Sequence, residues 1–261
     1  MSVVSEERKR LIIEKVEQKG KVKVTDLANE FSVSTETIRR YLEDLDKDQK
    51  LKKVYGGAVK QEASSLMEPS MVERNILNIS QKKRIAYQAA TFIRDGDVIV
   101  IDEGSTTLQL VPYLLPYKNL TIMTNSFSLV NQLISAVNKE TFNGQIVFLG
   151  GKVNAKHFRV SGTMSQEIMN QLYFDKAFIS VDGILPSFGL SSYDLDKAKM
   201  SKMMIKQAQQ SFVLADYSKI NQRGTYQIVQ LTEVDYLLSD QDCPGAWSRV
   251  LLQNQVQWVK C

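Results

Sequence analysis

The spacing of hydrophobic and polar positions divides the chain into two parts. Over the first fifty residues, apolar side chains recur every three or four positions, as on one face of an α-helix. This pattern predicts three helices, over residues 5–19, 25–31 and 34–47. Residues 51–55 then predict a strand that turns at Gly56-Gly57 and returns through Ala58-Val59. Three helices and a small hairpin predict a winged helix-turn-helix in residues 1–60.

Each of the three predicted helices begins near a residue whose side chain can cap it. These residues are Ser5, Thr25 and Ser34. On the third helix, Ile38, Leu42 and Leu45 share one face at about 100° per residue, with Tyr41 at its edge. The opposite face is charged, which leaves it free to meet a partner.

From residue 79 onward, short apolar runs alternate with helical patterns. The runs predict strands over 97–102, 120–123, 145–149, 176–181, 211–215 and 234–238, with helices over 82–94, 127–137 and 196–209. The nearly continuous run Asp97–Asp102 is typical of a parallel strand buried on both faces. We therefore expect an α/β fold in residues 79–261, an open sheet covered on both faces. Residues 61–78 show no clean period and are interpreted as a linker.

The distribution of charge along the chain indicates the class of partner. The chain has 261 residues and a net charge of +4. Residues 1–60 hold 14 basic and 11 acidic residues, whereas the rest holds 19 and 18, so most of the positive excess lies in the first quarter. A basic first domain favours a nucleic-acid partner.

The supply of histidine and cysteine excludes several classes of protein. The chain has one histidine, His157, and two cysteines, Cys243 and Cys261. A zinc module, a multi-histidine metal site and a disulfide-rich secreted fold would each need more of them. We expect no metal and no cofactor. Without an apolar run of membrane-spanning length or a signal peptide, we expect a cytoplasmic protein with no membrane partner.

The helix-turn-helix over about residues 22–41 supplies the candidate DNA-binding residues. A recognition helix meets base edges and phosphates near its N-terminal end, and basic residues of a wing can hold the adjacent backbone. The candidates for these two roles are Thr25, Ser34, Thr35, Thr37, Arg39, Arg40, Lys52, Lys53 and Tyr55. The alternative is a three-helix bundle whose arginines face water.

Polar loops at the carboxyl ends of the predicted strands supply a second candidate site. Ligands of open α/β sheets bind at this edge, and a strand-to-helix turn with free backbone amides suits an anion. The candidates are Asp102, Gly104, Ser105, Thr106, Thr107, Thr124, Asn125, Ser126, Gly150, Gly151, Asp182, Gly183 and Lys219. Any one of these loops could be an ordinary turn. Together they predict a bowl for a phosphorylated polyol, with the phosphate on the 104–107 amides.

An enzyme is the main alternative for this second site. A sugar-phosphate isomerase or hydrolase needs a base placed at the reactive carbon, and Asp102, Glu103, Asp182 or Lys219 could be recruited. The sequence shows no clear base–acid pair. His157 either lines the pocket beside Lys156 and Arg159 or is an exposed loop residue, and we favour the exposed position.

Several of these motifs resemble the DeoR family of bacterial sugar-operon regulators. The resemblance rests on Val24–Ala28 and Ser34–Arg40 in the helix-turn-helix, Tyr55–Ala58 in the wing, and four loops of the second part, at 102–107, 124–126, 150–151 and 215–219. It implies a DNA-binding regulator, usually a repressor, whose sensor domain resembles sugar-phosphate isomerases and binds a phosphorylated sugar. It also implies a homo-oligomer, a dimer or tetramer. Membership of the lactose phosphotransferase-system repressor-like subgroup is compatible with these motifs.

The chain departs from the pattern of this family in three places, the last of which involves two residues. Tyr41 stands where the family usually has Asp, and a usual Gly is missing at Gln49-Lys50. In the helix near residues 196–205, Lys197 and Ser201 replace the family's usual Glu and Lys. The first two departures leave the operator open. The third changes the charge near the expected pocket and leaves the effector open.

Overall fold

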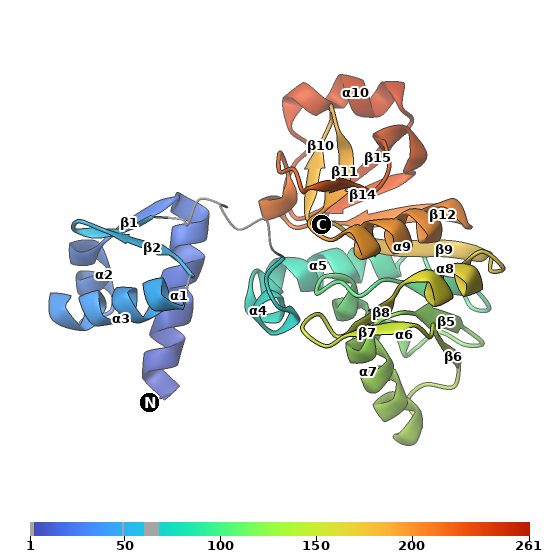
Figure 1. The fold of residues 1–261 in the computed structure, drawn as a ribbon, viewed down its shortest axis with the longest axis horizontal. Coiled ribbons are helices and arrows are strands. Elements are labelled where there is room, and N and C mark those ends of the chain that lie inside the picture. Colours follow the sequence, from blue (N-terminus) through green and yellow to red (C-terminus); the bar gives the residue numbers. More distant parts are fainter. Residues whose placement is uncertain (1–2, 49, 60–67) are drawn as a thin grey trace. The chain divides into compact units, whose positions relative to one another are not determined.

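The chain forms two compact units, divided between residues 65 and 66. The computed structural model describes residues 3–48, 50–59 and 68–261, with the side chains described from Ser5 onward. Figure 1 traces both units from the N-terminus to the C-terminus.

The first unit is a winged helix-turn-helix, as predicted. It contains the helices α1 (Val3–Lys19), α2 (Val24–Glu30) and α3 (Thr35–Lys47) and a three-stranded antiparallel sheet in the order β1-β3-β2. The strands are β1 (Lys21–Lys23), β2 (Lys52–Val54) and β3 (Gly57–Val59). Apolar residues of all three helices, including Ile12, Leu27 and Ile38, form its core.

Only one of the three predicted helix caps is confirmed. Ser34 caps α3, because its Oγ accepts a hydrogen bond from the backbone N–H of Thr37 at 3.1 Å. Thr25 and Ser5 do not cap: Thr25 lies inside α2, which follows Lys23 without a side-chain cap, and Ser5 lies inside α1. The sequence pattern also missed β1, because three residues at a helix boundary give no measurable alternation.

The second unit is built on a seven-stranded sheet in which every neighbouring pair is parallel. Its order is β15-β14-β12-β9-β4-β5-β6. The strands are β4 (Val98–Ile101), β5 (Thr121–Thr124), β6 (Gln145–Phe148), β9 (Phe174–Ser180), β12 (Ala208–Leu214), β14 (Tyr236–Ser239) and β15 (Gln257–Lys260). The predicted open α/β sheet is therefore confirmed.

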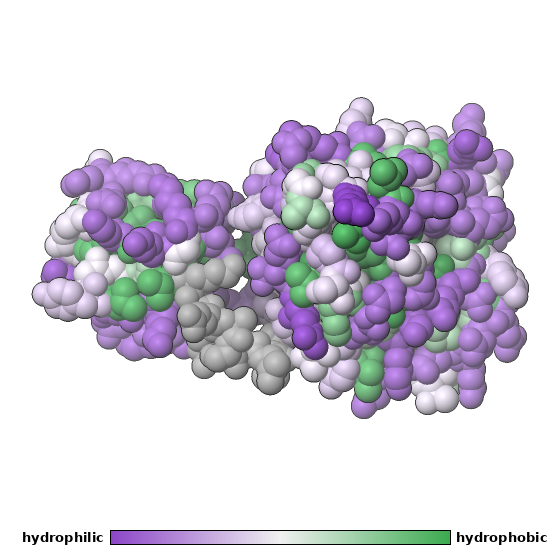
Figure 2. All heavy atoms as spheres, turned by 90° about the horizontal axis from the view of Figure 1, so that it is seen from above, coloured by the Kyte–Doolittle hydropathy of each residue, from purple (hydrophilic) through white to green (hydrophobic). Residues whose placement is uncertain are grey.

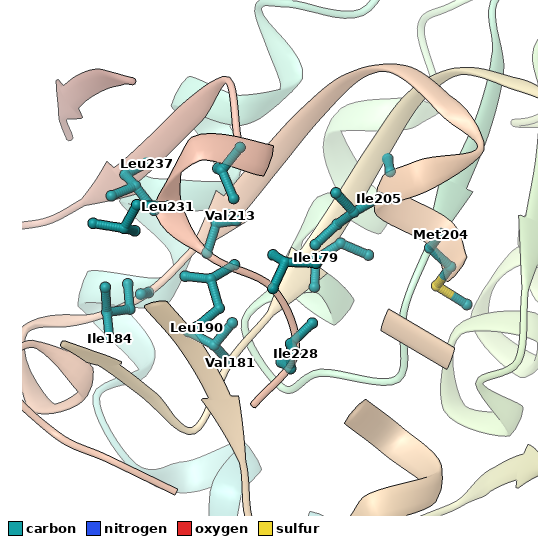
Figure 3. Packing of buried hydrophobic residues seen from close by; sticks show 14 of the residues in the cluster. Ile179, Val181, Ile184, Leu190, Met204, Ile205, Val213, Ile228, Leu231 and Leu237 are labelled. Carbon is teal, nitrogen blue, oxygen red and sulfur yellow. The ribbon is translucent and has the colours of Figure 1, made fainter. Parts of the chain in front are cut away.

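Helices cover both faces of this sheet, which explains the apolar runs of its strands. One core contains residues of α5 (Ile79–Ala90), η1 (Thr107–Leu110), α6 (Val111–Leu114) and α7 (Phe127–Asn138). The other contains residues of α8 (Thr163–Met169), α9 (Leu195–Lys206), η4 (Gly245–Trp247) and α10 (Ser248–Gln253). Figure 3 shows part of the second core, where Ile205 of α9 lies near Ile179 of β9; Met204 of α9 belongs to the same core.

Smaller elements stand beside the carboxyl edge of the main sheet. The hairpin β7 (Lys152–Asn154) and β8 (Arg159–Ser161) follows β6, and a second antiparallel sheet joins β10 (Gly183–Leu185), β11 (Gly189–Ser192) and β13 (Tyr226–Gln227). Three short 3₁₀ turns complete the unit, η2 (Tyr217–Lys219), η3 (Leu231–Glu233) and η4. The sequence pattern missed β7, β8, α8, β10, β11 and β13.

The predicted linker 61–78 needs correction in its second half. Residues 61–67 lie outside the described residues, but Met71–Ile76 form helix α4, capped by Ser70 and Glu73 in a capping box. Met71 and Arg74 are buried, so this stretch belongs to the packed second unit. The sequence pattern did not predict this helix, because a helix of 6 residues makes fewer than two turns and shows too little periodicity.

Hydrophilic residues cover most of the face seen in Figure 2. Large apolar side chains that remain exposed, such as Tyr173 before β9 and Leu252 of α10, come from separate parts of the chain. No helix in the described part of the chain is long and apolar enough to cross a bilayer.

Candidate functional site

The DNA-binding candidates of the first unit lie on an exposed face. Thr35, Arg39 and Arg40 are exposed on α3, and Lys52, Lys53 and Tyr55 are exposed on the wing. Thr25 and Ser34 are also exposed, whereas Thr37 is half-buried and exchanges a hydrogen bond with the Ser34 hydroxyl at 2.9 Å. The fold therefore presents basic side chains where a major-groove helix would need them.

The two arginines of α3 differ in their ion pairing. Arg39 contacts Glu36 at 3.2 Å, which ties it to its own helix. Arg40 makes no ion pair with another described residue. The guanidinium of Arg40 is thus the freer of the two to meet a phosphate or a guanine.

Tyr41 takes a structural position in this unit. It is 5% exposed and belongs to the apolar core, so it is more buried than its place at the edge of the helix face predicted. A hydrogen bond with the side chain of Ser5 is the main cause that lowers its pKa. The departure from the family's usual Asp is therefore accommodated by contacts with α1.

In the second unit, the predicted loops follow five neighbouring strands. They come after β12, β9, β4, β5 and β6, which are consecutive in the sheet. Because all five strands are parallel, their carboxyl ends meet at one edge. The structure therefore brings the sequence-predicted loops to a common edge.

The loop after β4 is organised around Asp102. Its Oδ1 accepts hydrogen bonds from the Gly104 amide at 3.0 Å and the Thr107 hydroxyl at 2.6 Å. Its Oδ2 accepts from the amide and hydroxyl of Ser180, at 2.7 and 2.8 Å. Burial and the neighbouring Glu103 raise the pKa of Asp102 to about 6. Asp102 thus holds the loop in shape.

Asp102 leaves the next residues of the loop available. The backbone amides of Ser105 and Thr106 donate no hydrogen bond to another backbone group of the described residues. Ser105 is 6% exposed and Thr106 is 5% exposed. Buried amides without an acceptor are unfavourable unless a ligand or water meets them. This loop is therefore suited to an anion.

Gly104 is required by close packing against β9. A Cβ at this position would collide with the side chain of Ser180 and lie 2.8 Å from the Thr107 hydroxyl. Any larger residue would displace the loop and its Asp102 contacts.

Glu103 and Asn125 join the β4 and β5 loops to the β7–β8 hairpin. Asn125 donates from Nδ2 to Glu103 Oε2 at 3.0 Å and to the Val160 carbonyl at 3.1 Å. Glu103 Oε1 lies 3.1 Å from NH1 of Arg159. The neighbouring Thr124 accepts from the amide of Ser126, and Ser126 caps α7. These contacts are structural, and Asn125 Oδ1 remains without a partner among the described residues.

Asp182, after β9, forms a buried ion pair with Lys197 of α9. Lys197 Nζ lies 3.1 and 3.2 Å from the two carboxylate oxygens, and Ser192 donates to Asp182 at 2.8 Å. Burial acts against both charges, but Lys197 holds the pKa of Asp182 far below its ordinary value, and Asp182 raises that of Lys197. Lys197, one of the departures from the family pattern, thus lies within the site.

The structure adds a residue that sequence analysis missed, Glu68. This carboxylate is 4% exposed and contacts Arg74 at 2.7 Å, Arg159 at 3.1 Å and Lys197 at 3.4 Å. Burial would raise the pKa of Glu68, but Lys197, Arg74 and Arg159 hold it below its ordinary value. Arg159 also contacts Asp194 at 3.0 Å, so it joins three carboxylates. We call Arg74, His157, Arg159 and Lys197 the cation cluster.

The prediction that His157 is exposed is wrong. The residue is 7% exposed, and its Nδ1 lies 3.6 Å from Glu68 Oε2. Burial is the largest cause that lowers its pKa, with Glu68 acting against it. The pocket alternative is the one that the structure supports, because the β7–β8 hairpin carries His157 and Arg159 to the same carboxylate.

The remaining predicted residues lie at the flanks of this edge. Gly150 and Gly151 follow β6 and are half-buried, and Ser165 donates to the Gly150 carbonyl. Gly183 begins β10 and packs against the backbone of Gln222. Lys219 is half-buried in η2. Burial acts to raise the pKa of Asp182 and Asp216, and Lys219 is among the charges that lower it, so its charge lies near both carboxylates.

The missed members of the site had a weak signal in the sequence. Arg159 and Lys197 stood out only as a neighbour of His157 and as a departure from a pattern. Glu68 and Arg74 lay in the expected linker. Their contacts join residues 91 and 129 positions apart, which no local spacing can show.

Family comparisons agree with both units. The profile of the DeoR-like helix-turn-helix domain matches residues 8–63, and that of the DeoR C terminal sensor domain matches residues 77–241. A ribose-5-phosphate isomerase structure, solved with phospho-erythronic acid, has a TM-score of 0.40 at 21% identity and covers 54% of each chain.

Curated relatives span most of the chain. An HTH-type transcriptional regulator of Staphylococcus epidermidis is 37% identical and covers 82% of this chain and 83% of its own length. YulB, an HTH-type regulator of Bacillus subtilis, is 34% identical over 96% of this chain and 95% of its own length. A lactose phosphotransferase system repressor of S. epidermidis is 29% identical over 86% and 88%.

These relatives are named as transcriptional regulators rather than enzymes. With a helix-turn-helix unit, a sensor unit and matches to both family profiles, the chain is a DNA-binding transcriptional regulator that belongs to the DeoR family.

Proposed function

We propose that the protein represses a sugar-utilisation operon and that a phosphorylated sugar bound in the second unit changes its affinity for the operator. The effector site is the carboxyl edge of the sheet from β12 to β6. The phosphate lies on the amides of Ser105 and Thr106, and the buried carboxylates and Asn125 face the sugar hydroxyls. The observation that carries this proposal is the loop after β4, where Asp102 organises a turn whose next amides have no described acceptor.

DNA recognition is assigned to α3 and the wing. Thr35, Arg39 and Arg40 near the start of α3 would enter the major groove, and Lys52, Lys53 and Tyr55 would hold the adjacent backbone. Regulators of this type read two half-sites with two copies of the helix, so the active form is a dimer or tetramer. Light scattering of the purified protein checks this: a monomer at assay concentrations would contradict it.

Repression requires that the effector distinguish two states of the protein. A ligand shifts operator affinity only if it binds the DNA-bound and DNA-free arrangements with different strength. A lactose phosphotransferase system repressor among the relatives supports sugars as the class of effector. The organisation of Asp102 supports binding rather than catalysis, because four protein donors already occupy its two oxygens.

A thermal-shift titration of the full chain tests the effector site. Pentose and hexose phosphates are compared with the same sugars without phosphate. A ligand at about 100 times its Kd should add about 2.7 kcal/mol of stability. Failure of every phosphorylated sugar to raise the melting temperature would reject the site.

The variant Thr106→Val locates the phosphate. The Thr106 hydroxyl donates to no described residue, and the side chain is nearly isosteric with valine, so the fold should be retained. Affinity for the active sugar phosphate should fall about tenfold, the cost of about one hydrogen bond to a charged group. Thr163→Val, at the start of α8, is the control and should leave the affinity unchanged. Unchanged affinity in Thr106→Val would move the phosphate elsewhere. Gly104→Val is unsuitable, because the new side chain would collide with Ser180.

A further inference from the structure

Glu68 is a carboxylate that the chain itself inserts among the cations of the effector site. It precedes α4 and contacts Arg74, Arg159 and Lys197 within 3.4 Å, with His157 at 3.6 Å. All five side chains are nine-tenths or more buried. A single residue close to the first unit in sequence thus neutralises a group of cations at the sheet edge.

This cluster has more hydrogen-bond donors than Glu68 can satisfy. Within the described residues, Nε and NH2 of Arg74, Nε of Arg159 and Nδ1 of His157 are buried without a hydrogen-bond partner. Among the described residues, Glu68 is also the one carboxylate that forms an ion pair with Arg74. Buried donors of this kind are unfavourable, and arginine pairs fit an anion with several acceptor oxygens. Among the described residues, the cluster therefore has donor capacity left for an anion with more acceptor oxygens than one carboxylate.

The contacts of Glu68 also connect it to the loops that were predicted to hold the effector. One nitrogen, NH1 of Arg159, lies 3.1 Å from both Glu68 and Glu103. Lys197 joins Glu68 to Asp182 in the same way. An anionic group that enters between these loops therefore meets the cations that Glu68 now holds.

We propose that Glu68 is an internal competitor of the effector: its carboxylate occupies the cation cluster, and the phosphate of the incoming sugar phosphate displaces it while resting on the Ser105 and Thr106 amides, since Arg159 contacts both Glu68 and Glu103 of the β4 loop. This rests on the proposed effector site and extends it by Arg74, His157 and Arg159. Only eight residues separate Glu68 from Val59, the last residue of the wing. Release of Glu68 therefore frees the end of the segment that tethers the DNA-binding unit, which gives the ligand a route to operator affinity.

The variant Glu68→Gln tests the competition with inorganic phosphate as the probe. The substitution keeps the shape and removes the charge, so the full chain should bind inorganic phosphate at least about tenfold more tightly, equivalent to about 1.4 kcal/mol. Arg74→Met in the Glu68→Gln background should reverse the gain, because it removes a cation that the phosphate would use. Asp242→Asn is the control, since this exposed carboxylate contacts only Lys260 among the described residues.

Equal or weaker phosphate binding by Glu68→Gln would overturn the proposal, because a purely structural carboxylate does not compete. The proposed function has a separate readout, the effect of sugar phosphates on operator binding by the unmodified chain. A response there together with no gain in Glu68→Gln would reject the competition alone. No response there would reject the effector function itself.

Hydrogen exchange of the unmodified chain gives a test that does not depend on the variant's folding. Saturating inorganic phosphate should speed amide exchange in residues 68–76, because the displaced Glu68 no longer anchors α4. A ligand that merely tightened the unit would slow exchange there. Slower or unchanged exchange in residues 68–76, with slower exchange in residues 104–107, would contradict displacement.

Discussion

The two units place their charged side chains in opposite ways. Of the described residues in the first unit, Lys9 is the one buried charged group, and the candidate DNA contacts are exposed or half-buried. The second unit buries ten charged side chains besides His157, most of them at the carboxyl edge of the sheet. Exposed charges contribute little to folding and are free to meet the phosphates of DNA. Buried charges must find partners within the fold, so a ligand that changes those partners also changes the structure.

The largest effect on stability is expected from removing the charge of Arg159, which contacts three carboxylates. Arg159→Met leaves Glu68 and Glu103 buried without this partner and should lower the free energy of unfolding by about 3–5 kcal/mol. Urea unfolding of the full chain measures it. Arg249→Met, an exposed arginine of α10, should change stability by less than about 0.5 kcal/mol. Equal losses in the two variants would remove the distinction between buried and exposed charge.

Stability should also depend on pH through Asp102. Its pKa in the folded chain, about 6, lies above the ordinary 3.8, so the folded state binds this proton more tightly than the unfolded state. The stability from Asp102 is fully present below about pH 4 and is lost as the pH rises through 6. The advantage of the native chain over Asp102→Asn should therefore shrink by up to about 3 kcal/mol between pH 4 and 7. Urea unfolding across this range checks it, and a constant difference would contradict the raised pKa.

In the first unit, removing an exposed arginine should leave the fold intact. Arg40→Ala removes an exposed guanidinium and should weaken operator binding by about 1–3 kcal/mol, roughly five- to 150-fold. A gel-shift titration with an operator selected in vitro measures the affinity. The matched control is Arg94→Ala, an exposed arginine of the second unit, which should bind DNA normally. Normal binding by Arg40→Ala would reject the docking of α3.

The smallest effect is expected from the wing. Lys52→Ala should weaken binding less than tenfold but lower the slope of log affinity against log salt by about 0.9, the value for one phosphate contact. Titrations at several salt concentrations measure the slope. Thr91→Ala, exposed beyond the end of α5, serves as the control. An unchanged slope in Lys52→Ala would place the wing away from the DNA backbone.

Local signals in the sequence were sufficient for much of the fold. Ser34 caps α3 as predicted, and the run at 97–102 is a central parallel strand, because capping and apolar runs depend on neighbouring residues. The loop at 102–107 also lies where the strand-to-helix pattern placed it. Short elements such as β1 and β8 were missed, since three residues carry too little periodicity.

The partners inside the site could not be predicted from spacing. Glu68 meets Arg159 and Lys197 only because the fold brings β8 and α9 to the same edge of the sheet. His157 was expected outside because a polar stretch is usually exposed, yet ion pairs make burial of such a stretch tolerable. A buried network is a property of the tertiary structure, whereas the exposed face of α3 follows from its helical period.

The central claim is that ligand binding in the second unit changes DNA binding by the first. The direct measurement is the operator affinity of the full chain, determined by gel shift with and without each phosphorylated sugar that stabilises the protein. The account predicts that at least one sugar phosphate lowers operator affinity by fivefold or more, about 1 kcal/mol of coupling, while its unphosphorylated sugar has no effect. A sugar phosphate that binds tightly at the β4 loop but leaves operator affinity unchanged would contradict it.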